Sequence, residues 1–410
     1  MEFIRSNIYE IKKAGSLKTM GGILALLHLV LFYFWWSAGN LPLKYVQQDL
    51  PMCWSLLENC GWLRALPIGL LTFLFYAYGT MMGLAALIFL LTEFVGLGVY
   101  LMLISGLFGF LLYIQDLRLS SNEGYFIFLA TFAYLSVPSK HRLMRWLIVS
   151  FLVARGLSQA TPDWLTGNWY MSHLGLPVKL AEWLAALSVL VQMIGAAALI
   201  FRDGRYFWTG WISLLFFECA HLYMGELMSS IVAMGALVYV AIDEFELRKA
   251  EREYIYQSFI RPEPSMFWGA ILLSFFWMAQ VTPFVNLGPS SRLRSFLDVW
   301  ALHPEAAAED CEQTTLAIYK DRTEEIGLDP QLNEQPAMFC NVYMRYLDLR
   351  NLCKQLKEKD ANFVTLSSAM HIRSYRQRAE YTAFEVQDFC DPNLTFKGLR
   401  EVQWTMNQGK

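Results

Sequence analysis

The sequence predicts an all-α polytopic membrane protein of about nine transmembrane helices, followed by a small C-terminal α+β domain outside the membrane. Of its 410 residues 55% are apolar and 15% aromatic, and the mean hydropathy is +0.32. Such a chain is too apolar for a soluble protein. A helix needs about twenty mostly apolar residues to cross a bilayer. That length predicts spans at 20–38, 66–91, 95–115, 124–137, 143–160, 179–201, 206–224, 226–243 and 266–287.

Composition divides the chain into five parts. Residues 1–19 form a cytoplasmic N-terminal segment, 20–243 the main transmembrane domain, 244–265 a charged cytoplasmic linker, 266–287 the last transmembrane helix, and 288–410 an extracytoplasmic α+β domain. In the last part, residues 337–359 look helical, whereas 362–376 and 379–390 contain the alternating, β-branched and aromatic runs typical of strands.

Basic residues set the expected orientation, because cytoplasmic loops are enriched in Lys and Arg. Four basic clusters fall on one side of the predicted spans: Lys12, Lys13 and Lys18; Lys140, Arg142 and Arg145; Arg202 and Arg205; and Lys249, Arg252 and Arg261. The N-terminus is then cytoplasmic, with the first span acting as signal anchor. We expect a multi-pass protein of the inner (plasma) membrane, or of the endoplasmic reticulum membrane in a eukaryote.

The N-terminal segment has two readings. Apolar residues alternate with charged ones in the pattern of an amphipathic helix lying on the inner membrane surface. An ordinary basic flank of the first span explains the same residues.

Cysteine positions fit this topology. Six of the seven cysteines lie in predicted outer segments, and only Cys219 lies in a span. Disulfides are expected on an oxidising side, although some of the six could be buried thiols. The six are Cys53, Cys60, Cys311, Cys340, Cys353 and Cys390.

Ionisable residues inside a bilayer are costly and are candidates for function. Glu93 and Glu182 lie near span ends, where snorkelling explains them. Glu218 and His221 are three residues apart and share a helix face. A carboxylate beside an imidazole would form a proton-handling pair and is the catalytic candidate. A structural histidine satisfied by one partner is the alternative. The remaining intramembrane candidates are Arg155 and Glu226.

Arg155 shares a helix face with Ser158 and Gln159. Its guanidinium could hold a lipid phosphate or a substrate carboxylate by bidentate hydrogen bonds. An internal ion pair with Glu218 or Glu182 is the other interpretation. In either case it is no base, because guanidinium keeps its proton.

The segment 161–178 has the aromatic, Gly- and Pro-rich composition of a membrane interface. We expect it to roof an outward-facing site, with Trp164 among the binding residues.

Several residues together resemble the vitamin K-dependent γ-glutamyl carboxylase family and related HTTM-domain membrane proteins. The first group is Gly156 and Leu157 followed by Asp163-Trp164-x-x-Gly167, with Lys179 at the loop exit. The second is His221 ahead of Leu227-x-Ser229, and a third, Asn122 and Tyr125, matches the family before a span. The likeness covers roughly residues 118–240.

The resemblance implies a lipophilic cofactor between the helices, quinone or lipid, and one disulfide that clamps the first outer loop to the outer domain. In the family two lysines follow the Gly-Leu pair, one of them the base that deprotonates the quinol. Ser158 and Gln159 stand there in this chain, and Glu123 replaces a catalytic histidine. The family's outer domain is also larger and more β-rich. Classical glutamate carboxylation is therefore not expected.

Two functions remain. The first is a membrane-embedded, enzyme-like protein that binds a lipophilic cofactor or lipid and acts on a peptide or secreted protein at the outer face. The second is a non-catalytic accessory or assembly subunit of a membrane complex or peptide-maturation system. A transporter is disfavoured, since no inverted repeat is visible. No phosphate loop or metal-ligand motif is found, and the net charge of −3 gives no nucleic-acid footprint.

Overall fold

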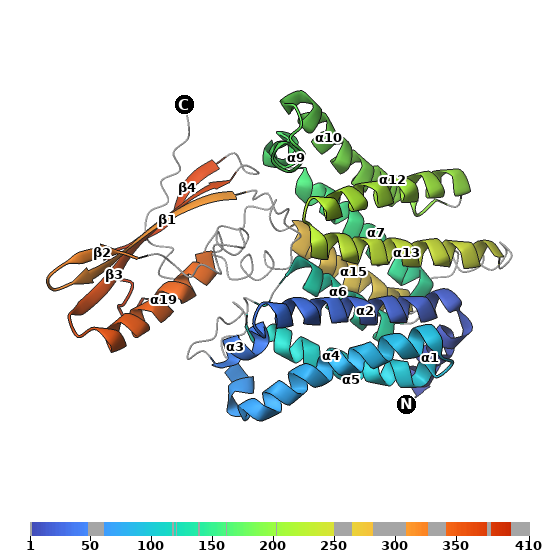
Figure 1. The fold of residues 1–410 in the computed structure, drawn as a ribbon, viewed down its shortest axis with the longest axis horizontal. Helices are drawn as coiled ribbons and strands as arrows, with labels where there is room; N and C mark the ends of the chain where they lie inside the picture. Colours follow the sequence, from blue (N-terminus) through green and yellow to red (C-terminus); the bar gives the residue numbers. More distant parts are fainter. Residues whose placement is uncertain are drawn as a thin grey trace.

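The computed structural model describes residues 2–47, 61–116, 119, 121–137, 140–160, 162–201, 203–249, 265–281, 309–326, 342–374 and 379–394. These residues form a bundle of helices with a small sheet domain at one end (Figure 1). The bundle end beside the sheet domain is called the sheet end. The opposite end, where the N-terminus lies, is called the N-terminal end.

The bundle is built from long helices with apolar surfaces. In chain order they are α1 (Glu2–Lys13), α2 (Gly15–Ser37), α4 (Ile68–Leu91), α5 (Val95–Ile114), α6 (Asn122–Ser136), α7 (Lys140–Gln159), α10 (Val178–Leu190), α12 (Gly204–Tyr223), α13 (Leu227–Lys249) and α15 (Ser265–Val281). Short helices connect them: α3 (Leu41–Gln47), η1 (Gly61–Ala65), α8 (Pro162–Leu165) and α9 (Asn168–Leu174). A π turn, η3 (Val191–Gly195), and α11 (Ala196–Ala198) continue α10.

Within the described residues, five helices are long and apolar enough to cross a membrane: Gly15–Ser37, Ile68–Leu91, Val95–Ile114, Val178–Ala198 and Leu227–Arg248. The chain is thus a multi-pass membrane protein, but the expected nine spans are not reached. At the other four predicted positions, α6 has 15 residues and α15 has 17. The 20-residue helices α7 and α12 carry charged side chains.

Polar side chains tie the first helices together. His28 of α2 is fully buried, and its Nδ1 lies 2.8 Å from the hydroxyl of Tyr78 on α4. Its Nε2 lies 2.9 Å from the hydroxyl of Thr131 on α6. Both ring nitrogens have partners, so this group stabilises helix packing. Close approach also needs Gly79, where a Cβ would meet the ring of Phe32 at 2.9 Å.

Charged side chains from α7 and α13 meet at the N-terminal end. Ser16 at the start of α2 and His141 on α7 both contact Asp243 near the end of α13. Arg145 donates to Asp243 and Glu244 at 2.9 Å each. We call these five residues the Asp243 cluster. Because α13 continues to Lys249, the predicted linker 244–265 begins as the last turns of that helix.

The N-terminal segment forms a helix of its own, α1, that packs against the bundle. It is not merely a basic extension of the first span. On α1, Ile11 is fully buried in the bundle core. Asn7 donates to the backbone carbonyl of Leu135 and accepts a hydrogen bond from the buried ammonium of Lys140. This places α1 across the N-terminal end.

Glu93 lies outside the bundle, in the turn between α4 and α5, where 82% of its side chain is exposed. It accepts a hydrogen bond from Lys18 at 2.8 Å. That hydrogen bond and the charge of Lys18 lower the pKa of the Glu93 carboxyl below its ordinary value. A position at a helix end agrees with the snorkelling interpretation.

The C-terminal domain is an antiparallel sheet with a helix on one face, an α+β arrangement. The sheet has the order β2-β1-β3-β4, in which Glu309 of β1 pairs with Ser374 of β3. Its elements are β1 (Glu309–Tyr319), β2 (Thr323–Glu325), α19 (Val342–Lys359), β3 (Phe363–Ser374) and β4 (Ala379–Val386). Leu349 of α19 packs with Leu366 and Phe384 of the sheet.

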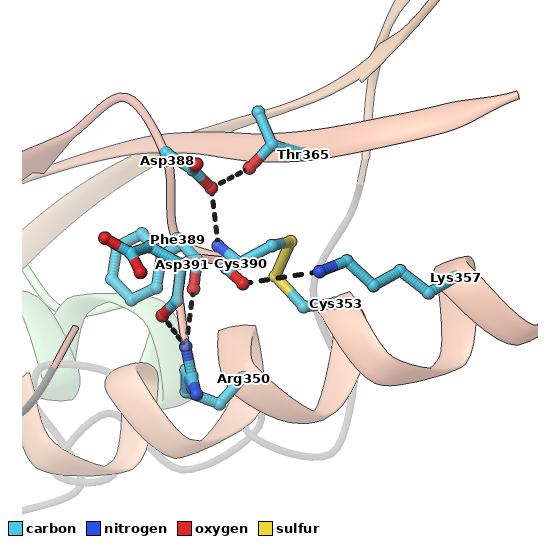
Figure 2. The surroundings of a disulfide bond; sticks show 8 residues. All are labelled: Arg350, Cys353, Lys357, Thr365, Asp388, Phe389, Cys390 and Asp391. Atoms are coloured by element: carbon cyan, nitrogen blue, oxygen red, sulfur yellow. Dashed lines mark hydrogen bonds between the residues drawn. A yellow bond between two sulfur atoms is a disulfide. The ribbon is translucent and has the colours of Figure 1, made fainter. Parts of the chain in front are cut away.

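A disulfide closes this domain (Figure 2). Cys353 of α19 is bonded to Cys390, which follows β4. Arg350, one turn earlier, donates to the backbone carbonyls of Phe389 and Asp391 at 3.1 and 2.5 Å. The segment after β4 is therefore fixed to the helix covalently and by hydrogen bonds.

The other two cysteines in the described residues differ in bonding state. Cys311 is also disulfide-bonded, whereas Cys219 on α12 is a free, exposed thiol. Cys53, Cys60 and Cys340 lie outside the described residues, and with them the predicted clamp from the first outer loop. The sheet domain meets the bundle through α19, because Met344 is buried in the bundle core.

Candidate functional site

Five buried polar side chains meet near the sheet end of the bundle, and we call them the Arg155 cluster. Arg155 lies near the end of α7, and Glu218 and His221 lie near the end of α12. Glu226 lies in the turn before α13, and Tyr170 lies on α9. No side chain of the five is more than 5% exposed.

Arg155 is the hub of this cluster. Its Nη1 donates to Glu218 Oε2 at 2.5 Å, and its Nη2 donates to Glu226 Oε2 at 2.7 Å. These charge-assisted bonds join α7 to α12 and to the start of α13. The internal ion pair predicted as one alternative is therefore present with Glu218. Glu182, the other predicted partner, is exposed on α10.

His221 also faces Arg155, which fixes its protonation. Arg155 Nη2 lies 3.2 Å from His221 Nδ1. A guanidinium can only donate, so Nδ1 must be the unprotonated nitrogen and the proton sits on Nε2. Nε2 in turn points at the Tyr170 hydroxyl, 3.5 Å away. His221 is therefore a neutral acceptor for Arg155.

The expected Glu218–His221 pair takes a different form. The two residues share a face of α12, as their spacing predicts, but both side chains reach for Arg155 rather than for each other. The carboxylate near His221 Nδ1 is Glu226, at 3.9 Å. The guanidinium between them supplies the stronger hydrogen bonds.

The three predicted binding residues beside Arg155 lie close to it. Ser158 is buried, and its hydroxyl donates to the Arg155 carbonyl at 2.7 Å. Gln159 is 1% exposed. Trp164 is fully buried, donates to the Ser188 hydroxyl at 3.2 Å, and packs edge-on against His221 with ring centroids 6.0 Å apart.

The predicted aromatic roof is formed by α8 and α9. Trp164 of α8 stacks on Trp169 of α9 and contacts Tyr170. Gly167 between the two helices has a φ of +72°, and a Cβ there would collide with the backbone of Ala181. The Asp-Trp-x-x-Gly pattern thus has a local reason for its glycine.

A second glycine positions Glu226. Gly225 has a φ of +102° and turns the chain between α12 and α13. The backbone N–H of Glu226 donates to the His221 carbonyl at 3.1 Å. This tight turn brings the Glu226 carboxylate back beneath α12 to reach Arg155.

Gln192 is the residue that sequence reasoning missed. It lies in the π turn η3, is fully buried, and packs against α7 where Gly156 leaves space, since a Cβ on Gly156 would be 2.9 Å from that of Gln192. π turns in helices often mark functional sites. The sequence signal that could have found Gln192 is that it is a single amide side chain in the apolar run 179–201.

Some buried polar atoms near Arg155 have no hydrogen-bond partner in the described part of the chain. They are Glu218 Oε1, Gln159 Oε1, and both Oε1 and Nε2 of Gln192. Ser230 lies beside Glu218, without a hydrogen bond of normal geometry. Leaving such atoms unsatisfied is costly, so the cluster is incomplete by itself.

Glu123, the residue at the family's histidine position, lies in the first turn of α6 behind its N-cap Ser121. It interacts electrostatically with Arg155 and Glu226. The cluster therefore has more carboxylates than cations around it. Among the residues described, no group of three His, Cys, Asp or Glu side chains could hold a metal ion.

The chain matches no protein-family model, no curated protein and no solved structure. The Arg155 cluster and its position in the bundle are therefore the features that bear on function.

Proposed function

We propose that this is an integral membrane protein of the γ-carboxylase-like kind that binds a lipophilic cofactor or lipid at the Arg155 cluster. In this proposal it acts on a peptide or secreted protein at the outer face, without classical glutamate carboxylation. The observation that carries it is a buried ionic group with unpartnered polar atoms beside it, in a bundle that contains five membrane-length helices. Intramembrane groups of this type mark functional sites.

The grouping of the motif residues supports the proposal. Arg155 and Gly156, the Trp164 roof and His221 are distant in the sequence and are joined around one cluster. Of these, Gly156, Trp164 and His221 are positions on which the resemblance to the carboxylase family rests. The sheet domain, which contacts the bundle through α19, lies at this end and would face a polypeptide substrate (Figure 1).

The absence of carboxylation follows from the chemistry of the replaced residues. Deprotonating a quinol requires a base such as a desolvated neutral amine. The Ser158 hydroxyl is bonded to its own helix, an amide such as Gln159 is no base, and Arg155 keeps its proton. Glu218 and His221 remain the groups able to handle protons, provided that a ligand moves Arg155 away from them.

The accessory-subunit function is favoured by one observation. Arg155 already has two carboxylates and His221 as partners, an arrangement that can simply hold three helices together. In that case the sheet domain would be the working surface, and its deletion would abolish function while substitutions at the cluster would not.

Orientation and location are part of the proposal. The basic clusters of the sequence favour a cytoplasmic location for the N-terminal end. The sheet domain, with its disulfides, is then extracytoplasmic, in the inner (plasma) membrane or in the endoplasmic reticulum membrane of a eukaryote.

Mass spectrometry of organic extracts from the purified protein tests the proposal. We expect one lipophilic molecule per chain, lost in Glu218→Gln and His221→Ala. The matched variants Glu244→Gln and His141→Ala of the Asp243 cluster should keep it. Retention unaffected by all four changes would contradict the proposal. Fixation of labelled bicarbonate into a glutamate peptide with reduced vitamin K would contradict the non-carboxylating chemistry.

A further inference from the structure

The Arg155 cluster is short of one positive charge. Glu218 and Glu226 share the single cation Arg155. His221 cannot supply a second charge, because its Nδ1 accepts from the guanidinium. Glu123, close enough to interact electrostatically, adds to the excess of carboxylates. A buried, uncompensated carboxylate is strongly unfavourable.

The cluster also contains buried acceptors without a donor, beside the unpartnered donor Gln192 Nε2. Glu218 Oε1, Gln159 Oε1 and Gln192 Oε1 are buried acceptors that find no donor among the residues described. They lie on the adjoining elements α12, α7 and η3. Gln159 follows Arg155 by one helical turn, and Gln192 packs against Gly156.

One chemical group fits both the missing positive charge and the three unpaired acceptors. A primary alkylammonium carries one positive charge and three N–H donors, and its alkyl stem needs no polar partner. Ca²⁺ and Mg²⁺ prefer six or more oxygen ligands, more than the three acceptors available here. An anion would meet the carboxylates Glu218 and Glu226, which already accept from Nη1 and Nη2 of Arg155.

We propose that the Arg155 cluster binds the protonated amino head of a membrane lipid, held by Glu218, Gln159 and Gln192. This rests on the proposed lipid-binding function and names the lipid class. The anionic ligand considered from the sequence is replaced by a cationic one.

The surroundings favour a lipid as the source of the amine. The helix that turns Gln192 inward exposes Leu187, Leu190 and Ile194, the last with 65% of its surface accessible. The cluster lies at the ends of α7 and α12, the depth expected for lipid headgroups. An amphiphile can therefore place its chains along α10 and its head among the acceptors.

The test uses full-length protein equilibrated with phosphatidylcholine vesicles that contain one added lipid. The added lipids are phosphatidylethanolamine, its N-methyl and N,N-dimethyl derivatives, and phosphatidylglycerol. Native mass spectrometry then counts retained lipid. Retention should fall with each N–H removed, by about ten-fold from the ethanolamine to the choline head, since bonds to charged groups are the stronger ones.

Two variants locate the binding. Gln192→Leu should lower retention of phosphatidylethanolamine by about ten-fold and leave phosphatidylcholine unchanged. The control Gln115→Leu removes another buried glutamine, which donates to the Pro42 carbonyl away from the cluster. It should retain the lipid like the unmodified protein.

Equal retention of the ethanolamine and choline lipids, or preference for phosphatidylglycerol, would overturn the inference. So would full displacement by free ethanolamine, which would identify a soluble amine instead. If a lipid without an amine is retained and is lost in Glu218→Gln, the proposed function stands and only the amine assignment fails. If nothing is retained, both fail.

Discussion

Two of the three arginines on helix α7 have similar partners and differ in how completely those partners are satisfied. Arg145 binds Asp243 and Glu244, with His141 beside them. Arg155 binds Glu218 and Glu226, with His221 beside them. The first group lies at the N-terminal end of the bundle and the second toward the sheet end, and α13 or the turn before it contributes to both.

The two clusters differ in saturation. In the Asp243 cluster all four carboxylate oxygens have partners, because Ser16 and His141 reach one oxygen of Asp243, Arg145 reaches both residues, and Arg248 reaches the last oxygen of Glu244. In the Arg155 cluster Glu218 Oε1 has none within the described chain. The same residue types therefore form a structural clamp at one end and an incomplete site at the other.

The largest difference is expected when each arginine is removed. Arg155→Met leaves two buried carboxylates without a cation and should lower the free energy of unfolding by about 3–5 kcal/mol. Arg145→Met should cost about 1 kcal/mol, because that side chain is 17% exposed and Arg248 remains. Unfolding in detergent micelles measures both, and equal costs would remove the distinction.

A double-mutant cycle sharpens the comparison. Glu218→Gln in the Arg155→Met background removes one of the two uncompensated charges, so the double variant should recover about 2 kcal/mol relative to Arg155→Met. The matched cycle of Arg145→Met with Glu244→Gln should show a coupling below about 1 kcal/mol. Similar coupling energies in the two cycles would mean that the arginine–glutamate pair contributes equally to stability in both clusters.

The two histidines should differ less. His221→Leu removes the acceptor of Arg155 Nη2 and should cost about 1–2 kcal/mol. His141→Leu should cost below about 1 kcal/mol, since its side chain is 34% exposed and Asp243 keeps Arg145 and Ser16. Thermal unfolding of the two purified variants decides the order, and a larger loss for His141→Leu would contradict it.

The N-terminal end has its own buried cation, Lys140, which precedes the predicted span 143–160. Its ammonium donates to Asn7 and to the Val137 carbonyl, and burial lowers the pKa of Lys140 to about 8 from 10.5. Between these pH values the unfolded chain holds more protons than the folded one. Stability should therefore rise with pH in this window.

The slope from Lys140 should be at most about 1.4 kcal/mol per pH unit. Subtracting the pH profile of Lys140→Met isolates it, because the other titrating groups are common to both proteins. A difference that is flat, or that falls as the pH rises, would show that the Lys140 pKa is not lowered.

The apolar helices were predictable because their length is set by the bilayer. The run 95–115 corresponds to α5 within one residue, and the run 226–243 to the larger part of α13, which continues to Lys249. Strand β1 was missed, since its inward positions include Thr315, which pairs with Ser368 across the sheet. A polar inward face hides the alternation that identifies a strand.

The site was predictable only in part. An arginine and a glutamate inside predicted spans indicated an ion pair, since neither is tolerated alone. Nothing in the sequence ranks Glu226 above Glu182 as a partner of Arg155. That choice depends on the turn at Gly225, which the structure shows. The place of Gln192 depends on a π turn, for which no sequence rule is available.

The π turn also makes the site removable in one step. Each residue advances an α-helix by about 100°, so deleting Val191, which precedes Gln192 in the turn, would rotate Gln192 and the helix beyond it relative to α7. The helix would keep nearly its full apolar length, but the side chain of Gln192 would no longer point toward α7. A single-codon deletion could thus separate the anchoring role of this segment from its recognition role.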